Sequence, residues 1–266
     1  MRPVPPVTTF FPREHGAYGQ VAFPILTAVA VAGASVPGVL LSASVIAGFL
    51  AHEPAAVLLG HRGGRARREL WDGAIRWLGW CAALGATAGV AALYRMPAGL
   101  RWSLAVPLAP ALVLAYMTIA GREKSSSGEV AAALAFAGVA VPVSLAGGAR
   151  LENAVAIAVP FAILFICGTL AVRVVILKVR GGGNPQAVRV TRATAFTVAA
   201  GAIAALGAAG ATDMLPRGVL AAALPGVLTA TIVAASPPPP SRLRTLGWTL
   251  IAVSVLTAVV TIIVAS

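Results

Sequence analysis

Charged residues are scarce in this chain. Asp, Glu, Lys and Arg make up 11% of its 266 residues, whereas ordinary soluble domains carry roughly a quarter. Hydrophobic residues make up 59%, and the mean hydropathy is +0.90. A soluble fold of this length would leave much of that apolar surface in contact with water. The scarcity of charge therefore excludes an ordinary soluble domain and predicts a chain whose solvent is lipid.

Cysteine and metal-binding motifs are also nearly absent. The two cysteines, Cys81 and Cys167, both lie inside apolar runs. Isolated cysteines in such runs usually pack as small hydrophobic side chains, and they give neither a disulfide framework nor a metal-ligand spacing. No HExxH or CxxC motif occurs in the chain. We therefore predict no metal site from the sequence.

Nine apolar runs are long enough to cross a bilayer, whose core of about 30 Å needs about 20 helical residues. The first run is predicted to be a retained span, because residues 1–12 contain four prolines and lack the pattern of a signal peptide. Backbone groups in lipid must be satisfied within their own segment, so all nine runs are expected to be helices. The sequence predicts an all-α polytopic membrane bundle forming one transmembrane domain over residues 1–266, with a short cytoplasmic tail at 1–12. The predicted spans are residues 16–35, 37–59, 74–93, 103–120, 130–148, 154–177, 193–211, 218–235 and 246–266.

Small residues are frequent in the third, fifth, seventh and eighth spans. Such residues allow membrane helices to approach closely. Five glycines are therefore expected to face neighbouring helices, namely Gly85, Gly89, Gly138, Gly201 and Gly207.

Basic residues alternate from loop to loop. With the N-terminus in the cytoplasm, 16 of the 20 lysines and arginines fall in inner segments and four fall in outer loops. The positive-inside rule favours this orientation, which places the C-terminus outside a cell membrane. The net charge of +12 comes from these short clusters and not from a basic stripe with interleaved aromatics, so we expect no nucleic-acid partner.

Polar residues gather where the first span begins, in the motif PREHGAY over residues 12–18. Pro12 suits the first turn of a helix, and Glu14 would lie at the positive end of the helix dipole. One interpretation is a helix cap at the membrane interface. The other is a cytoplasmic cavity lined by Glu14, His15 and Tyr18, since Glu14 and Tyr18 share one helical face and three polar groups exceed what a cap needs.

A second polar group, His52-Glu53-Pro54, lies near the end of the second span. Pro54 removes a backbone hydrogen bond and disfavours helix at Glu53, and broken helices at membrane depth occur where they are buried in protein or line a cavity. Ser44, Gly48 and His52 recur every fourth residue and form one polar face. We expect a site here; the alternative is a kink in which an arginine neutralises Glu53.

A third group lies on one face of the sixth span, where Thr169, Arg173 and Arg180 are joined by Lys178. Lys178 and Arg180 can snorkel to the interface, whereas Arg173 lies deeper and needs a partner, for which Glu53 is the expected one. All three groups would line one basic cytoplasmic cavity suited to an anionic headgroup or phosphate. The catalytic candidates are His52, Glu53, Glu14 and His15, and the ligand-binding candidates are Arg13, Tyr18, Arg62, Arg173, Lys178 and Arg180.

The PREHGAY motif, the HEP motif at 52–54 and the basic Gly-rich loop HRGGRARR at 61–68 resemble those of the YwiC-like family of bacterial membrane proteins, from which no established activity carries over. The nine-span layout also resembles the UbiA superfamily of intramembrane prenyltransferases. That resemblance implies a polyprenyl diphosphate bound through Mg²⁺ at Asp-rich motifs after the second and sixth spans. The chain departs from it, because Glu53, Glu69 and Asp72 form no NDxxD pattern and no acid occurs between Glu152 and Asp213.

Three functions remain open from the sequence. The first is a UbiA-like membrane protein whose remodelled basic cavity binds an isoprenoid or an anionic lipid. The second is a true prenyltransferase with substitute ligands, for which Mg²⁺ would be the cofactor. The third is a transporter or membrane assembly factor whose polar face gates a pathway.

Overall fold

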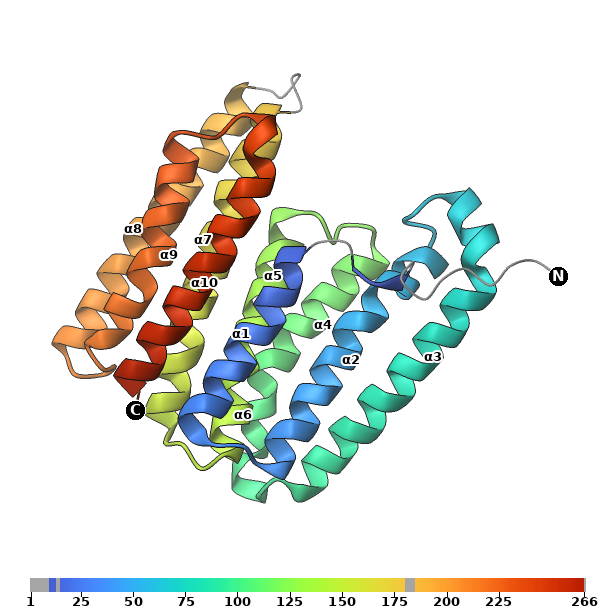
Figure 1. Cartoon of the computed structure of the whole chain (residues 1–266), viewed down its shortest axis with the longest axis horizontal. Coiled ribbons are helices and arrows are strands. Elements are labelled where there is room, and N and C mark those ends of the chain that lie inside the picture. Colours follow the sequence, from blue (N-terminus) through green and yellow to red (C-terminus); the bar gives the residue numbers. More distant parts are fainter. Residues whose placement is uncertain (1–9, 13–14, 180–184, 266) are drawn as a thin grey trace.

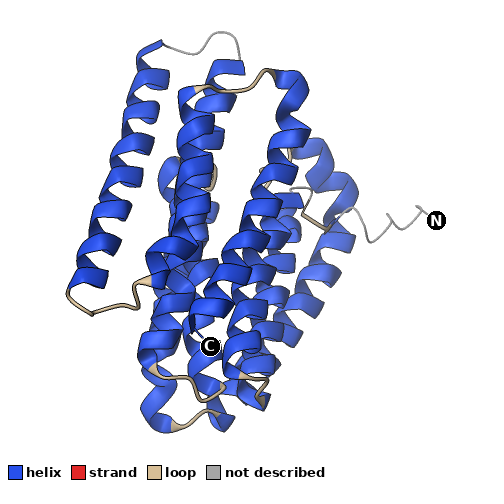
Figure 2. Ribbon diagram, turned by 60° about the vertical axis from the view of Figure 1, so that its left-hand side comes forward, coloured by secondary structure: helices blue, strands red, loops and turns tan. Residues whose placement is uncertain are grey.

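The protein is a bundle of long helices, shown in Figures 1 and 2. The structure is a computed structural model that describes residues 10–12, 15–179 and 185–265, and this part of the chain contains no strand. The helices are α1 (His15–Ala32), α2 (Val36–Leu58), α3 (Gly64–Arg95), α4 (Ala105–Ile119), α5 (Ser126–Gly138), α6 (Ala140–Ala146), α7 (Leu151–Val179), α8 (Pro185–Ala211), α9 (Gly218–Ala235) and α10 (Leu243–Ala265). Short 3₁₀ helices, η2 (Ala98–Leu104) and η3 (Pro240–Arg242), lead into α4 and α10.

Each predicted span coincides with a helical segment. Within the described residues, eight segments are long and apolar enough to cross a membrane, and α1 adds a shorter apolar stretch, Gly16–Ala32. The chain is therefore a multi-pass helical membrane protein, as its composition predicts. Successive helices run in opposite directions, except that α6 continues in the direction of α5, and α1 begins and α10 ends at opposite ends of the bundle (Figure 1).

The helix ends differ from the predicted spans in a regular way. α3 begins at Gly64, ten residues before its predicted span, and its 32 residues correspond to about 48 Å of helix, against a hydrocarbon core of about 30 Å. α8 likewise begins at Pro185, ahead of residue 193. Hydropathy marks only the part of a helix that lies in lipid, whereas arginine and glutamate are good helix formers and extend the helix beyond it.

Two prolines have unequal effects. The predicted break at Pro54 is wrong, because α2 continues through this residue to Leu58. The predicted fifth span, in contrast, is divided into α5 and α6 at Val139. Pro142 has no N–H to donate to the carbonyl four residues earlier, at Gly138, and its ring crowds that carbonyl. The break in the helix lies where this hydrogen bond is missing.

α7 lies between two groups of helices, α1–α6 on one side and α8–α10 on the other (Figure 1). Its residues Ile157 and Phe161 are fully buried in the largest hydrophobic cluster, which also includes parts of α1, α2, α3, α5 and α6. This packing holds the ends of α2, α5 and α7 at one end of the bundle.

Glycines allow close helix contacts at some of the predicted positions. A Cβ at Gly89 would lie 3.0 Å from Ser44 Oγ of α2, and one at Gly138 would lie 3.3 Å from the carbonyl oxygen of Val106. Gly85 similarly faces α2. For Gly201 and Gly207 the prediction is wrong, since a Cβ there would meet nothing within 4 Å.

Candidate functional site

The turn after α2 positions the first arginine of the site. Gly60 takes a left-handed conformation (φ 84°), and the N–H of His61 donates to the carbonyl of Ala56 at 2.9 Å. This six-to-one hydrogen bond is the Schellman helix end, in which glycine is preferred because it has no Cβ. This turn brings Arg62, two residues after the glycine, back beside the last turns of α2.

The turn after α4 repeats this geometry. Gly121 has φ 67°, and the N–H of Arg122 donates to the carbonyl of Met117 at 2.7 Å. Glu123 follows this glycine by two residues, as Arg62 follows Gly60. A Cβ at Gly121 would lie 3.7 Å from His61 Nε2, so the two turns are neighbours. We call the end of the bundle that carries both turns the network end.

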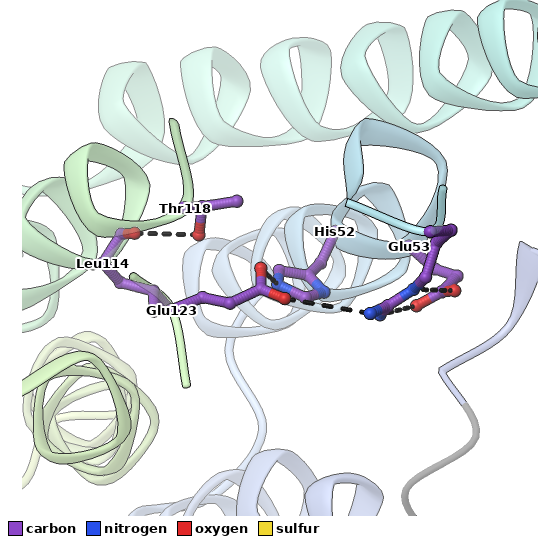
Figure 3. A network of polar contacts seen from close by, with 6 residues as sticks. His52, Glu53, Leu114, Thr118 and Glu123 are labelled. Atoms are coloured by element: carbon purple, nitrogen blue, oxygen red, sulfur yellow. Dashed lines mark hydrogen bonds and ion pairs between the residues drawn. The ribbon is translucent and has the colours of Figure 1, made fainter. Parts of the chain in front are cut away.

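Four ionisable side chains meet at these turns (Figure 3). Arg62 donates to both oxygens of Glu53, from Nε at 2.8 Å and from Nη2 at 2.6 Å. Arg62 Nη1 also lies 3.9 Å from Glu123, whose other oxygen is 3.1 Å from His52 Nε2. His52, Glu53, Arg62 and Glu123, here called the α2 network, therefore connect the end of α2 to the segment between α4 and α5.

Burial makes this pairing necessary. Glu53 is 8% exposed, and a buried carboxylate is costly unless it is paired and hydrogen-bonded. The side chains of Arg62 and His52 remain 30% and 35% exposed, so an exchangeable ligand can reach them. Thr118 donates to the carbonyl of Leu114 at 2.9 Å, within its own helix (Figure 3). Such a network can hold a guanidinium in a fixed orientation and can pass a proton between an imidazole and a carboxylate.

Arg173 of α7 makes a second ion pair at the same end. Its Nη1 donates to Glu129 Oε2 at 3.0 Å and to the carbonyl of Lys124 at 3.1 Å. The predicted partner, Glu53, is wrong, because Arg173 pairs with Glu129 whereas Glu53 pairs with Arg62. Glu129 lies at the start of α5, the helix that packs against α7.

One short segment joins the two ion-pair sites. Glu123 and Glu129 flank the start of α5, where the Ser125 hydroxyl accepts the N–H of Gly128 at 3.2 Å as an N-cap. A Cβ at Gly128 would collide with the backbone of Glu123, 2.9 Å from its carbonyl carbon. Glycine at position 128 therefore allows the fold that carries Glu123 to the α2 network.

The remaining predicted residues are placed less completely. The Tyr18 hydroxyl donates to the carbonyl of Pro12 at 3.0 Å, and its ring packs edge-on against Phe49, with centroids 5.1 Å apart. This contact puts the start of α1 against α2 about one turn before His52. Lys178 is exposed near the end of α7. Arg13, Glu14 and Arg180 lie outside the described residues, as does the side chain of His15.

Two carboxylates of the site, Glu123 and Glu129, are not among the residues predicted from the sequence. Both lie in a segment that the sequence interpretation considers only for its basic residues, Arg122 and Lys124. A usable signal is present: Glu129 follows the cap residue Ser125 in the first turn of a helix, where acids are favoured. Glu123 follows the left-handed Gly121, but its contact with α2 depends on tertiary packing.

The described residues do not fit a Mg²⁺ site. Among them, no group of three or more His, Cys, Asp or Glu side chains lies close enough to hold a metal ion. The two carboxylates of the α2 network, Glu53 and Glu123, are instead engaged by Arg62 and His52. Mg²⁺ requires several oxygen ligands in octahedral geometry, so we derive no chemistry through it.

Comparison with known proteins identifies a family. A family model described as YwiC-like protein matches residues 11–144, which is half of the chain. The matched region contains the α2 network and Glu129, whereas Arg173 and Lys178 lie beyond it. No curated protein and no solved structure matches the chain, so its likeness to the UbiA layout stays a prediction.

Proposed function

The chain belongs to the YwiC-like family, and on that premise we propose that it binds an anionic lipid, either a phospholipid or an isoprenoid phosphate, at the network end. The protein lies in the cell membrane as one transmembrane domain, with the network end and the N-terminus in the cytoplasm and the C-terminus outside. The α2 network is the observation that carries this proposal.

The charges around the two turns favour an anion. Among the described residues of the two turns and the adjoining ends of α5 and α7, five cations accompany three carboxylates, which is an excess of two positive charges. The cations are Arg62, Arg122, Lys124, Arg173 and Lys178, and the carboxylates are Glu53, Glu123 and Glu129. Arginines held by carboxylates present a pre-oriented planar guanidinium, which suits the oxygens of a phosphate.

Arg62 is the side chain best placed to change partners. Its bidentate contact with Glu53, at 2.8 and 2.6 Å, fixes the guanidinium, whereas its contact with Glu123 is 3.9 Å long. A phosphate oxygen would replace the longer contact and leave the shorter pair in place. Released from Arg62, Glu123 would keep its interaction with His52.

Lipid mass spectrometry of the protein purified in mild detergent tests this proposal. We expect a co-purified anionic lipid or isoprenoid phosphate, and a loss of about fivefold or more in its amount for Arg62→Gln, since one arginine near an anionic surface contributes about 1 kcal/mol. Arg65→Gln is the matched control, because Arg65 is exposed and pairs with Glu69 four residues on. Equal lipid retention by Arg62→Gln and the wild type would contradict the proposal.

A complementation assay tests whether the site is needed in cells. His52→Ala and Arg173→Ala should abolish function while leaving membrane insertion intact, because each removes one half of a contact that joins two segments. Full complementation by both variants would show that the network has no functional role.

A transporter is the second candidate, and the ion pairs across helices favour it. Contacts that join α2, the α4–α5 segment and α7 at one end of a bundle can close that end and reopen by exchanging partners. Counterflow of a solute in proteoliposomes, with no co-purified lipid, would favour this candidate. Magnesium-dependent prenyl transfer by the purified protein would instead establish a prenyltransferase with substitute ligands.

A further inference from the structure

An apolar groove lies away from the α2 network, on the lipid-facing side of the bundle. It has a volume of about 370 Å³ and lies where η2 and α4, α5 and α6, and the first half of α7 meet. This volume falls within the range of about 300–1,000 Å³ usual for pockets that bind small molecules. None of its lining residues belongs to either ion-pair site.

Small residues form the floor of the groove and large ones its rim. Gly138 and Ala158 are buried, while Trp102, Leu134 and Leu151 are exposed beside them. The lining is almost wholly apolar. A surface of this kind in a membrane bundle accepts a hydrocarbon chain and offers no group that would hold a polar substrate.

Two cations adjoin lining residues of this otherwise apolar groove along the chain. Arg101 directly precedes Trp102, and Arg150 directly precedes Leu151. Arg101 Nε donates to the carbonyl of Met96 at 3.3 Å, and Arg150 lies 3.7 Å from Glu152. Both arginines are exposed and lie shortly before α4 and α7, which begin at the end of the bundle opposite the network end (Figure 1). Trp102 beside them is typical of a side chain at the membrane interface.

We propose that this groove binds one chain of an anionic phospholipid whose phosphate is held by Arg101 and Arg150. Charge complementarity selects the occupant, because a zwitterionic lipid would bring its own cation to the two arginines. The bundle thus has a second lipid site, in the leaflet opposite to the α2 network. The site is independent of the proposed function, since it shares no residue with the α2 network or the Arg173 pair.

Tryptophan quenching tests this site directly. The five tryptophans include Trp71, Trp77 and Trp80 of α3 and Trp248 of α10, so a variant with these four replaced by Phe leaves Trp102 as the reporter. In vesicles, brominated phosphatidylglycerol should quench Trp102 more strongly than brominated phosphatidylcholine at the same mole fraction. Each of Arg101→Gln and Arg150→Gln should lower this preference about fivefold, as expected for about 1 kcal/mol per arginine.

Matched controls separate the rim charges from the groove itself. Arg217→Gln removes another cation from the same end, next to Asp213, and should leave the preference unchanged. Ala162→Phe fills the groove and should lower quenching by both lipids, whereas Ala252→Phe, on the exposed face of α10, should not.

Equal quenching by the two lipids would overturn the proposal, as would full lipid preference in the double arginine variant. Protection of Trp102 from both lipids together with cross-linking of two chains through α4 would assign the groove to a second copy. If the four-Phe variant does not fold, native mass spectrometry of the full chain with phosphatidylglycerol tests the same proposal. The Arg101 variant should then bind less of this lipid than the Arg217 variant. Loss of lipid at Arg62 with retention here, or the reverse, distinguishes the two sites.

Discussion

At the residue scale, Glu53 combines burial with a partner from its own neighbourhood. It lies in the last two turns of α2, and Arg62 follows it by nine residues. The Schellman turn at Gly60 returns the chain so that the guanidinium meets the carboxylate in a bidentate contact. The pair is therefore a local structure, completed once α2 and its turn have formed.

Glu53→Gln should destabilise the protein. The change leaves the guanidinium of Arg62 without its closest carboxylate, which we expect to cost about 1–3 kcal/mol for a partly exposed pair. Thermal unfolding in detergent, followed by tryptophan fluorescence, would show a lower Tm. Glu69→Gln removes an exposed carboxylate from an i,i+4 pair with Arg65 and should change stability by about 0.5 kcal/mol or less. Equal Tm shifts for the two variants would mean that burial of Glu53 contributes nothing.

The sequence predicts some residues of the site and not others for a physical reason. His52, Glu53 and Arg62 stand out because charge in or beside an apolar run requires an explanation. The partner of Arg173 could not be predicted, because Glu129 is 44 residues away along the chain and the contact depends on α5 packing against α7. Glu123 reaches His52 across 71 residues for a similar reason.

At the scale of elements, the segment from Gly121 to Glu129 positions two carboxylates of the site. It contains a left-handed glycine, an N-cap and a second glycine that allows its own backbone to fold closely. Apolar runs predict where the helices lie, yet they carry no information about such a segment. Apolar runs likewise do not predict the extension of α3 to Gly64 or the division of the fifth span at Val139.

Gly128→Ala should disturb this segment. Its Cβ would meet the backbone of Glu123, which cannot move aside as a flexible side chain can, so we expect a loss of about 1–3 kcal/mol together with displacement of Glu123 from His52. The Tm of thermal unfolding and the amount of retained lipid should both fall. Gly201→Ala, in α8 with open space around it, should be neutral or more stable by up to about 1 kcal/mol. Comparable losses in both variants would indicate a general intolerance of alanine.

Ser125→Ala tests the cap of α5 separately. The Ser125 hydroxyl accepts the N–H of Gly128, and removing such a cap costs about 1 kcal/mol. Ser125→Asp should keep most of that stability because its carboxylate also caps a helix. A lower Tm for both substitutions would show that the hydroxyl acts in some way other than capping.

At the scale of the whole molecule, alternating helices carry the basic turns to one end. The network end contains the turns after α2 and α4, and the opposite end contains those before α2, α4 and α9 (Figure 1). The bias of basic residues toward the network end is the sequence feature on which the proposed orientation rests.

Cysteine labelling tests the proposed orientation. In a chain with Cys81 and Cys167 replaced by Ala, Arg65→Cys should react with an impermeant maleimide only after cells are opened. Met214→Cys, 74% exposed between α8 and α9, should react in intact cells. Reaction of both cysteines in intact cells, or the reverse pattern, would contradict the orientation.

The placement of Glu123 and Glu129 six residues apart has a thermodynamic consequence. A ligand that also moves the backbone of Glu123 would shift the capped start of α5, and with it the carboxylate that holds Arg173 on α7. Ligand binding at the α2 network and the position of α7 are then coupled, and coupling free energies are reciprocal. A change in the position of α7 would therefore alter the affinity of the α2 network for its ligand.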